Sequence, residues 1–207
     1  MKKKKLFLFD LDGVLINSKS NMKFSWEAVN EKHQLNIGFK EYFSYIGRDF
    51  KDILKNLGIK KNFKKIEKTF KTNSKKKISK IKLYPFSKFL INYLKKKKIK
   101  VGIVTSKDCT RTRILLKKLS LKLDIVKCTD GYLPGKPNPI KIINILKKYK
   151  LKKKDAVLIG DMKIDVKMAK NAKIDYIHAN YGYYNNYINC KYKINNLKDI
   201  INNKLGI

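Results

Sequence analysis

From residue 84 onwards the sequence alternates between short apolar runs and amphipathic segments, and this alternation limits the folds that the chain can adopt. Four runs are typical of strands: KVGIVTS, DIVKC, DAVLIGD and KIDYIHA. The segments before and between them are typical of helices: FSKFLINYLKKKK, RTRILLKKL, IKIINILKKY and IDVKMAKNA. This order predicts parallel pairing, because each crossover between strands needs a dozen or more residues. The expected fold class is α/β, a doubly wound parallel sheet covered by helices on both faces.

The first strand of this sheet is expected far from the others, at residues 5–9. The block from 17 to 82 separates it from them and carries amphipathic helical patterns such as WEAVNEKHQL, with no strand signal. We therefore expect two units. Residues 1–16 and 83–207 form the core, and residues 17–82 form a small helical domain inserted after the first strand.

Polar side chains follow the predicted strands at the points where the strands end. They come from four separate places in the chain: Asp10, Asp12, Thr105, Ser106, Lys136, Asp161 and Asp165. Taken singly, each fits an ordinary turn or helix cap. Taken together, they converge on the edge where open α/β sheets bind ligands. The sequence thus predicts one functional site at the carboxyl ends of the strands.

The residue types in this group indicate a particular chemistry. Carboxylates directed at one point repel each other, and their pKa values rise unless a cation is present. Oxygen ligands suit Mg²⁺, which holds few protein carboxylates and keeps phosphate oxygens of the substrate. Asp10 and Asp161 come from neighbouring strand ends and can share such an ion. A phosphate bound there needs donors on its far side, which the Thr105 hydroxyl and the Lys136 ammonium provide.

In this order the motifs resemble those of the haloacid dehalogenase superfamily, within its phosphoglycolate-phosphatase-like subgroup. FDLDGVL resembles the first motif of that family, IVTS the second, GKPNP the third and GDMKID the fourth. The resemblance covers nearly the whole chain. It implies a Rossmann-like core with a helical cap of the C1 type inserted after the first strand.

The resemblance also implies a role for each matched residue. Asp10 would be the nucleophile that forms an aspartyl-phosphate, and Asp12 would be the acid and base. Asp165 would orient the ion and the neighbouring lysine without binding the metal itself. The phosphoryl group would be held by Thr105, Ser106 and Lys136. The Mg²⁺ ion would be held by Asp10, the backbone carbonyl of Asp12, and Asp161.

The predicted cap is the place to look for substrate contacts. A cap closes over the site and excludes bulk water. The segment Ile46-Gly47-Arg48-Asp49 resembles the substrate-specificity loop of such caps, and Arg48 is one of only three arginines in the chain. Arg48 is therefore a candidate for binding the substrate, while Trp26 is more typical of the core of the cap.

Together these features predict a Mg²⁺-dependent phosphatase for a small phosphate monoester, such as a two- or three-carbon, polyol, amino-alcohol or sugar phosphate. The carboxylate at Asp12 favours phosphoryl transfer, because a dehalogenase expels halide and needs no acid there. A hexose-phosphate mutase of the same superfamily is the alternative, since it uses the aspartyl-phosphate to phosphorylate a second hydroxyl.

The net charge of +35 raises a third possibility, a basic nucleic-acid-binding module. Only three of the 51 basic residues are arginines, and the lysines are spread along the chain. Lys, Asn and Ile share A+T-rich codons, so genome composition can account for the charge. We expect no specific nucleic acid as a partner, only a small phosphorylated metabolite.

The three cysteines, Cys109, Cys128 and Cys190, are far apart, which argues against a zinc site and a disulfide framework. A reducing cytoplasm fits this pattern. The sequence has no stretch of about 18 apolar residues, so no membrane span is expected. We expect a cytoplasmic protein that is a monomer, with a dimer as the alternative.

Overall fold

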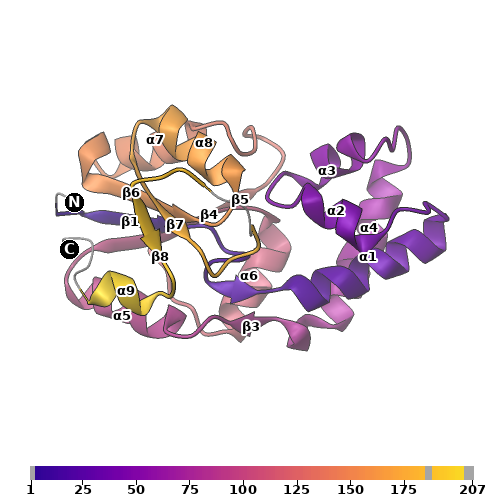
Figure 1. Ribbon diagram of the computed structural model, residues 1–207, viewed down its shortest axis with the longest axis horizontal. Helices are drawn as coiled ribbons and strands as arrows, with labels where there is room; N and C mark the ends of the chain where they lie inside the picture. The colour runs from indigo at the N-terminus through magenta and orange to yellow at the C-terminus, as the bar shows by residue number, and fades with distance from the viewer. Residues whose placement is uncertain (1–2, 185–187, 203–207) are drawn as a thin grey trace.

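The computed structural model describes residues 3–184 and 188–202 of the chain, and its centre is a six-stranded parallel sheet (Figure 1). The strands follow the order β5-β4-β1-β6-β7-β8. Their bounds are Ile125–Thr129, Lys100–Asp108, Leu6–Phe9, Ala156–Gly160, Asp175–Ala179 and Tyr192–Ile194. Every neighbouring pair is parallel, which confirms the predicted α/β class.

Helices cover both faces of this sheet, and alternate residues of each central strand face opposite layers (Figure 1). In β1, Phe7 and Phe9 pack on the side of α5 (Ser87–Lys96), α6 (Cys109–Lys118) and α9 (Lys198–Ile201). Leu6 and Leu8 pack on the side of α7 (Ile140–Lys148) and α8 (Lys163–Ala172). A strand buried on both faces explains the unbroken apolar run LFLF.

The chain changes direction across the sheet at β1. It runs from β1 through β4 to β5 on one side, and then crosses to β6, β7 and β8 on the other. A topological switch point therefore lies at the carboxyl ends of the central strands, where open sheets bind ligands. The residues that follow β1, β4 and β6 consequently meet at one edge of the sheet.

A helical insertion follows β1, as the sequence predicts. It consists of α1 (Lys19–His33), α2 (Phe39–Ser44), α3 (Phe50–Asn56) and α4 (Phe63–Lys76), which form a separate body beside the core in Figure 1. Its own apolar centre contains the fully buried Trp26, whose ring stacks on Tyr42 with centroids 4.3 Å apart. The chain leaves and re-enters the core through a two-stranded antiparallel ribbon of β2 (Ile16–Asn17) and β3 (Lys82–Leu83).

Three features of the fold differ from expectation or go beyond it. The sheet has a sixth strand, β8, and a short helix, α9, after the last strand predicted from the sequence. The prediction against disulfides is wrong for one pair, because Cys109 and Cys128 are bonded to each other. Cys109 follows β4 directly and Cys128 lies in β5, which is the neighbouring strand. This adjacency cannot be seen from the spacing of the cysteines in the sequence.

Within the described residues, no helix is long and apolar enough to cross a membrane.

Candidate active site

Four carboxylates and a lysine meet at the carboxyl edge of the sheet, beneath the insertion. Asp10 follows β1 directly, and Asp12 lies two residues further along. The chain turns between them and β2 at Gly13, whose φ of +87° suits glycine. A Cβ atom at Gly13 would lie 2.2 Å from Oδ2 of Asp161, so a larger residue would displace that carboxylate. The turn thus brings the loop after β1 against the end of β6.

A buried cluster forms where these strand ends meet. One carboxylate oxygen each from Asp10, Asp161 and Asp165 lies within 4.8 Å of the others, and all three side chains are buried. Lys136 Nζ lies between two of them, 2.8 Å from Oδ1 of Asp10 and 2.7 Å from Oδ1 of Asp165. The other oxygen of Asp165 accepts a hydrogen bond from the backbone N–H of Met162 at 3.1 Å. Both oxygens of Asp165 are therefore already engaged within the protein.

Burial and mutual repulsion shift the protonation of this cluster. Burial raises the pKa of Asp10 to about 7, although Lys136 opposes the shift. Burial, then the charges of Asp10 and Asp165, raise the pKa of Asp161 well above its usual range. Burial alone would lower the pKa of Lys136, but the two carboxylates beside it raise it above its usual value. The lysine is thus held charged, and among the described residues Asp161 forms no salt bridge with it or with any other cation.

The donor set fits a divalent cation of the Mg²⁺ type. Oδ2 of Asp161 accepts a hydrogen bond from the backbone N–H of Tyr183 at 2.6 Å. Its other oxygen, Oδ1, is buried and has no hydrogen-bond partner among the described residues. A buried carboxylate oxygen without a partner is costly, and a hard cation bound by oxygen ligands relieves that cost. Asp10 and Asp161, from adjacent strands, would supply oxygen ligands to such an ion.

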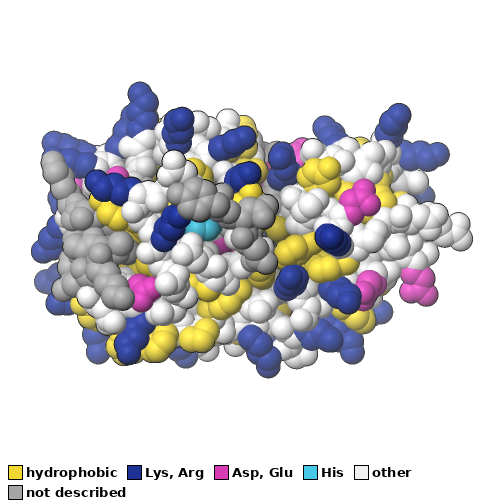
Figure 2. Space-filling model, viewed as in Figure 1, with side chains coloured by type: hydrophobic (Ala, Val, Ile, Leu, Met, Phe, Trp, Pro, Cys, Tyr) yellow, Lys and Arg dark blue, Asp and Glu magenta, His cyan; other side chains and the backbone are white. Residues whose placement is uncertain are grey.

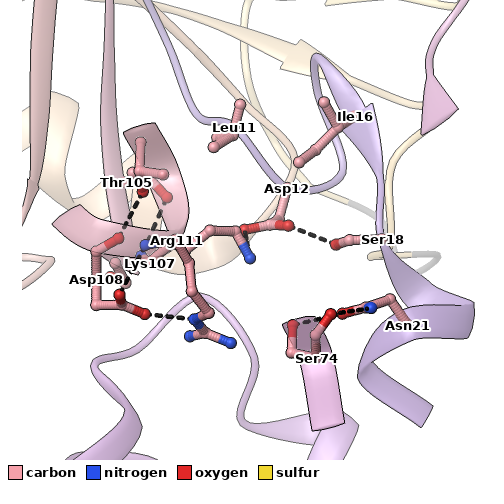
Figure 3. Close-up of polar contacts among 12 residues, drawn as sticks. Leu11, Asp12, Ile16, Ser18, Asn21, Ser74, Thr105, Lys107, Asp108 and Arg111 are labelled. Carbon is pink, nitrogen blue, oxygen red and sulfur yellow. Dashed lines mark hydrogen bonds and ion pairs between the residues drawn. The ribbon is translucent and has the colours of Figure 1, made fainter. Parts of the chain in front are cut away.

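Asp12 lies outside this cluster and is fixed by two partners of its own (Figure 3). Oδ2 of Asp12 pairs with Nζ of Lys107 at 3.0 Å, and Oδ1 accepts a hydrogen bond from the hydroxyl of Ser18. Lys107 comes from the end of β4, and Ser18 precedes the first helix of the insertion. Asp12 is thus connected both to the core and to the start of the insertion.

The remaining predicted residues line a cleft between the sheet edge and the insertion. Thr105 is buried in β4, and its hydroxyl accepts a hydrogen bond from the backbone N–H of Lys107 at 3.2 Å. The hydroxyl of Ser106 donates to the backbone carbonyl of Gly47, at 2.8 Å, and so joins the core to the insertion. Arg48 lines the same cleft from the loop between α2 and α3.

The cleft holds a cavity of about 50 Å³, and its two walls differ in character. The core wall is polar and includes Asp10, Asp12 and Thr105. The insertion wall is mainly apolar, and its lining residues include Met22, Tyr42, Ile46, Phe50, Ile53 and Phe70. The structure therefore brings Arg48 to the same cavity as Asp10, Asp12, Thr105 and Ser106. Lys136, Asp161 and Asp165 lie behind Asp10 and do not line the cavity.

Sequence reasoning missed Lys107, Ser18 and Tyr183. Lys107 is one of 48 lysines, so its type carries no signal. Ser18 is an ordinary residue before a helix. The Tyr- and Asn-rich segment 180–190 stands out in the sequence, but its position beside Asp161 is visible only in the fold. Residues 185–187 of that segment lie outside the described part of the chain.

Comparison with known proteins agrees with this geometry. The family model of haloacid dehalogenase-like hydrolases matches residues 7–179. The chain belongs to this family. This confirms the resemblance drawn from the four motifs, and the hydrolase family shares the core and the inserted helices described above.

Two curated relatives and one solved structure show how far the similarity extends. The phosphoglycolate phosphatase of Aquifex aeolicus is 26% identical over 188 residues, which cover 86% of each chain. The pyrophosphatase PpaX of Bacillus cereus is 27% identical over 168 residues, covering 80% of this chain and 78% of the relative. The crystal structure of a hydrolase from Pseudomonas syringae has a TM-score of 0.85 at 22% identity, covering 96% of this chain and 97% of that one. The likeness to this hydrolase concerns the fold alone.

Proposed function

We propose that this haloacid dehalogenase-like hydrolase is a Mg²⁺-dependent phosphatase that acts on a small phosphate monoester. One observation carries the proposal. The buried Asp10 lies within hydrogen-bond distance of Lys136 and close to Asp161, whose Oδ1 has no partner among the described residues. A carboxylate beside a fixed lysine and a cation site is equipped to attack a phosphate, since both cations reduce the repulsion between the two anions.

The first step forms a covalent intermediate on Asp10. An oxygen of Asp10 bonds to phosphorus while the bond from phosphorus to the ester oxygen breaks. The departing ester oxygen takes a proton from Asp12, and the alcohol leaves. Asp12 suits this role, because it lies two residues beyond Asp10 and lines the same cleft.

The second step restores Asp10. Asp12, now a carboxylate, takes a proton from water as the water oxygen attacks the phosphorus of the aspartyl-phosphate. The bond from phosphorus to the Asp10 oxygen breaks, and inorganic phosphate leaves. Lys107 and Ser18 hold the two oxygens of Asp12 in place for this exchange.

The other site residues hold the reacting groups. Thr105, Ser106 and Lys136 bind the phosphoryl oxygens, and Asp165 fixes the position of Lys136 through their hydrogen bond. Asp10, the carbonyl of Asp12, and Asp161 bind the metal. Bound Mg²⁺ offsets the repulsion between Asp10 and the incoming phosphate.

A compact substrate suits the site. The cavity of about 50 Å³ is far smaller than pockets for drug-sized ligands, which are typically ~300 Å³ or more. Candidate monoesters are phosphoglycolate and the phosphates of small polyols, amino alcohols and sugars. The similarity to the pyrophosphatase PpaX adds pyrophosphate, a phosphoanhydride, as a further candidate. Arg48 contacts the part of the substrate away from the reacting phosphate. The strongly positive chain also favours capture of anions.

A screen of some tens of phosphorylated metabolites, with and without Mg²⁺, tests the proposal. We expect release of phosphate from one class of small ester, only with the metal, and none from the Asp10→Asn variant. Incubation with a sugar 1-phosphate separates the mutase alternative, because a mutase yields the 6-phosphate in place of free phosphate. Turnover that survives Asp10→Asn would contradict the proposed nucleophile.

The nucleic-acid alternative has little support from the surface. On the face seen in Figure 2, basic side chains are scattered over the core and the insertion and do not gather in one groove. A gel shift at about 150 mM salt tests it. Binding that falls steeply with salt and shows no sequence preference indicates general attraction to phosphates.

We further propose that residues 17–82 act as a cap on a core of residues 1–16 and 83–207, divided at the ribbon of β2 and β3. The proposed compartment is the cytoplasm, and the proposed state is a monomer. The wide spacing of the cysteines in the sequence fits a reducing cytoplasm. The disulfide between Cys109 and Cys128 removes that support. The cytoplasmic location therefore depends on the class of substrate alone.

A further inference from the structure

The segment that follows β7 reaches the candidate active site, where Tyr183 lines the cleft, and the proposed mechanism leaves this segment without a role. Its backbone touches Asp161 closely. The N–H of Tyr183 donates to Oδ2 of Asp161 at 2.6 Å. A Cβ atom at Gly182 would lie 2.2 Å from Cβ of Asp161, so only glycine allows this approach. The segment therefore fixes one oxygen of a carboxylate that is proposed to bind the metal.

The side chain of Tyr183 reaches in another direction, to the start of the insertion. Its hydroxyl oxygen accepts a hydrogen bond from the backbone N–H of Ser18 at 2.7 Å and lies 3.1 Å from Oγ of Ser18. Ser18 is fully buried, and its hydroxyl donates to Oδ1 of Asp12. The hydrogen of the Ser18 hydroxyl is used on Asp12, so Tyr183 is the donor in the 3.1 Å contact between the two hydroxyls. The other acceptor near the Tyr183 hydroxyl, the carbonyl of Ile16, is farther away at 3.5 Å. The order of donors is therefore Tyr183, Ser18, Asp12.

The ring of Tyr183 makes a third contact, with the insertion. It packs against Phe43 of α2, with ring centroids 5.2 Å apart, and joins the apolar cluster of the insertion. Tyr183 thus makes three contacts. Its backbone N–H binds Asp161, its hydroxyl binds Ser18, and its ring packs on the insertion. Ser18 lies directly between β2 and α1, where the chain passes from the core into the insertion.

We propose that Tyr183 is a positioning residue that holds Asp12, through Ser18, in the orientation needed to protonate the leaving group. This inference rests on the proposed function, because it assumes that Asp12 acts as the acid. Without the Tyr183 hydroxyl, the buried N–H of Ser18 loses its partner, and the hydroxyl that orients Asp12 loses its support. Asp12 then samples other orientations, and proton transfer to the ester oxygen slows.

Tyr181 offers a matched control. It belongs to the same segment, and its hydroxyl donates to the backbone carbonyl of Val14 at 3.0 Å. Its ring packs edge-on against Tyr84, with centroids 5.0 Å apart. It touches neither Ser18 nor Asp12 through any hydrogen bond of the described residues. Tyr181→Phe therefore removes one hydroxyl from the same segment without disturbing the link to Asp12.

Two esters with different leaving groups distinguish a loss of Asp12 orientation from a general loss of enzyme activity. Phosphoglycolate expels an alkoxide, which needs a proton from Asp12, whereas p-nitrophenyl phosphate expels a phenolate that is stable without one. The ratio kcat/KM reports the steps up to release of the leaving group. We expect Tyr183→Phe to lower kcat/KM for phosphoglycolate roughly ten- to hundred-fold, and to change it for p-nitrophenyl phosphate by about two-fold at most. Tyr181→Phe should change both values about equally and little.

A second measurement needs no turnover. The exchange rate of the Ser18 amide, followed by NMR in the metal-free protein, should rise in Tyr183→Phe and stay near the wild-type rate in Tyr181→Phe. Ser18→Ala should reproduce the loss that is selective for phosphoglycolate. Combining it with Tyr183→Phe should add no further loss, because both changes break the same link.

Equal loss on both esters, or wild-type kinetics and an unchanged Ser18 amide in Tyr183→Phe, would overturn the inference. Failure of the proposed function is recognised separately. In that case the wild type hydrolyses neither ester with Mg²⁺, while the exchange of the Ser18 amide still reports whether Tyr183 holds Ser18.

Discussion

The two walls of the cleft differ in the side chains that form them. On and behind the core wall, charged groups are buried and in contact with one another, as in the contacts of Lys136 with Asp10 and Asp165. On the insertion wall, aromatic and aliphatic side chains dominate, and Arg48 forms no salt bridge within the described part of the chain. Buried, paired charges hold a fixed geometry, whereas an apolar wall that carries Arg48 sets only the size and charge of what binds there.

This difference suggests a division of work between the two regions. The core wall would fix the chemistry, because its groups have few alternative arrangements. The insertion wall would select the substrate, because its residues can change without disturbing the carboxylates. Changes to residues of the core and of the insertion test this division, and they are given in order from the largest expected effect to the smallest.

The largest effect is expected from a change on the core wall. Asp161→Asn should lower kcat by roughly 10³-fold, because it removes a charge from the proposed metal site. Steady-state kinetics over a range of Mg²⁺ concentrations check this. Asp52→Asn, on the exposed surface of α3, is the control and should behave as the wild type. An Asp161→Asn enzyme with normal kcat at ordinary Mg²⁺ would place the metal elsewhere.

The next effect concerns pH and the metal. The pKa values of Asp10 and Asp161 are raised in the folded protein, to about 7 for Asp10. Below the usual aspartate pKa these two side chains are protonated in both the folded and the unfolded protein. Their contribution to the free energy of unfolding is then fully present. It is lost as pH rises from about 4 through about 7, because the unfolded chain ionises more readily. The contribution of these two aspartates to the free energy of unfolding with EDTA should therefore fall across this range.

Urea denaturation at several pH values, with EDTA and with Mg²⁺, measures this trend. Mg²⁺ should reverse it, since the ion binds the ionised carboxylates and stabilises the folded state. The Asp10→Asn variant should show a shallower slope with EDTA than the wild type. A metal-free wild type whose stability falls no more steeply between pH 5 and 8 than that of Asp10→Asn would contradict the cluster. The comparison is needed because the lowered pKa values of His33 and His178 act in the opposite direction in both proteins.

The smallest effect is expected on the insertion wall. Arg48→Ala should raise KM for phosphoglycolate by roughly ten-fold and change kcat by about two-fold at most, because binding is lost without loss of chemistry. Arg113→Ala, on the exposed side of α6, is the matched control and should leave both values unchanged. A collapse of kcat with unchanged KM in Arg48→Ala would mean that the insertion takes part in the chemistry.

The sequence allowed prediction of the core wall better than of its surroundings. Asp10, Thr105 and Asp161 could be placed together because parallel strands bring their carboxyl ends to one edge. Lys107 could not be distinguished, since its only signal is an ion pair formed in the fold. The contact of Tyr183 with Ser18 joins residues 165 positions apart, and no local pattern reports it.

Other misses have equally physical causes. Strand β8 has three residues and helix α9 has four, which is too short for a periodic pattern to stand out. The disulfide joins cysteines that are 19 positions apart in the sequence but lie at adjacent strands. Such pairs become visible only when the order of strands is known.

The Asp12→Asn variant gives the most direct test of the central claim that Asp10 attacks phosphorus and Asp12 moves the protons. With p-nitrophenyl phosphate and Mg²⁺, the first step needs no acid, but the second step lacks its base. The account predicts a burst of one equivalent of nitrophenolate, and mass spectrometry of the quenched protein should find one phosphoryl group on Asp10. Steady turnover at the wild-type rate, or a phosphoryl group on a different residue, would contradict it.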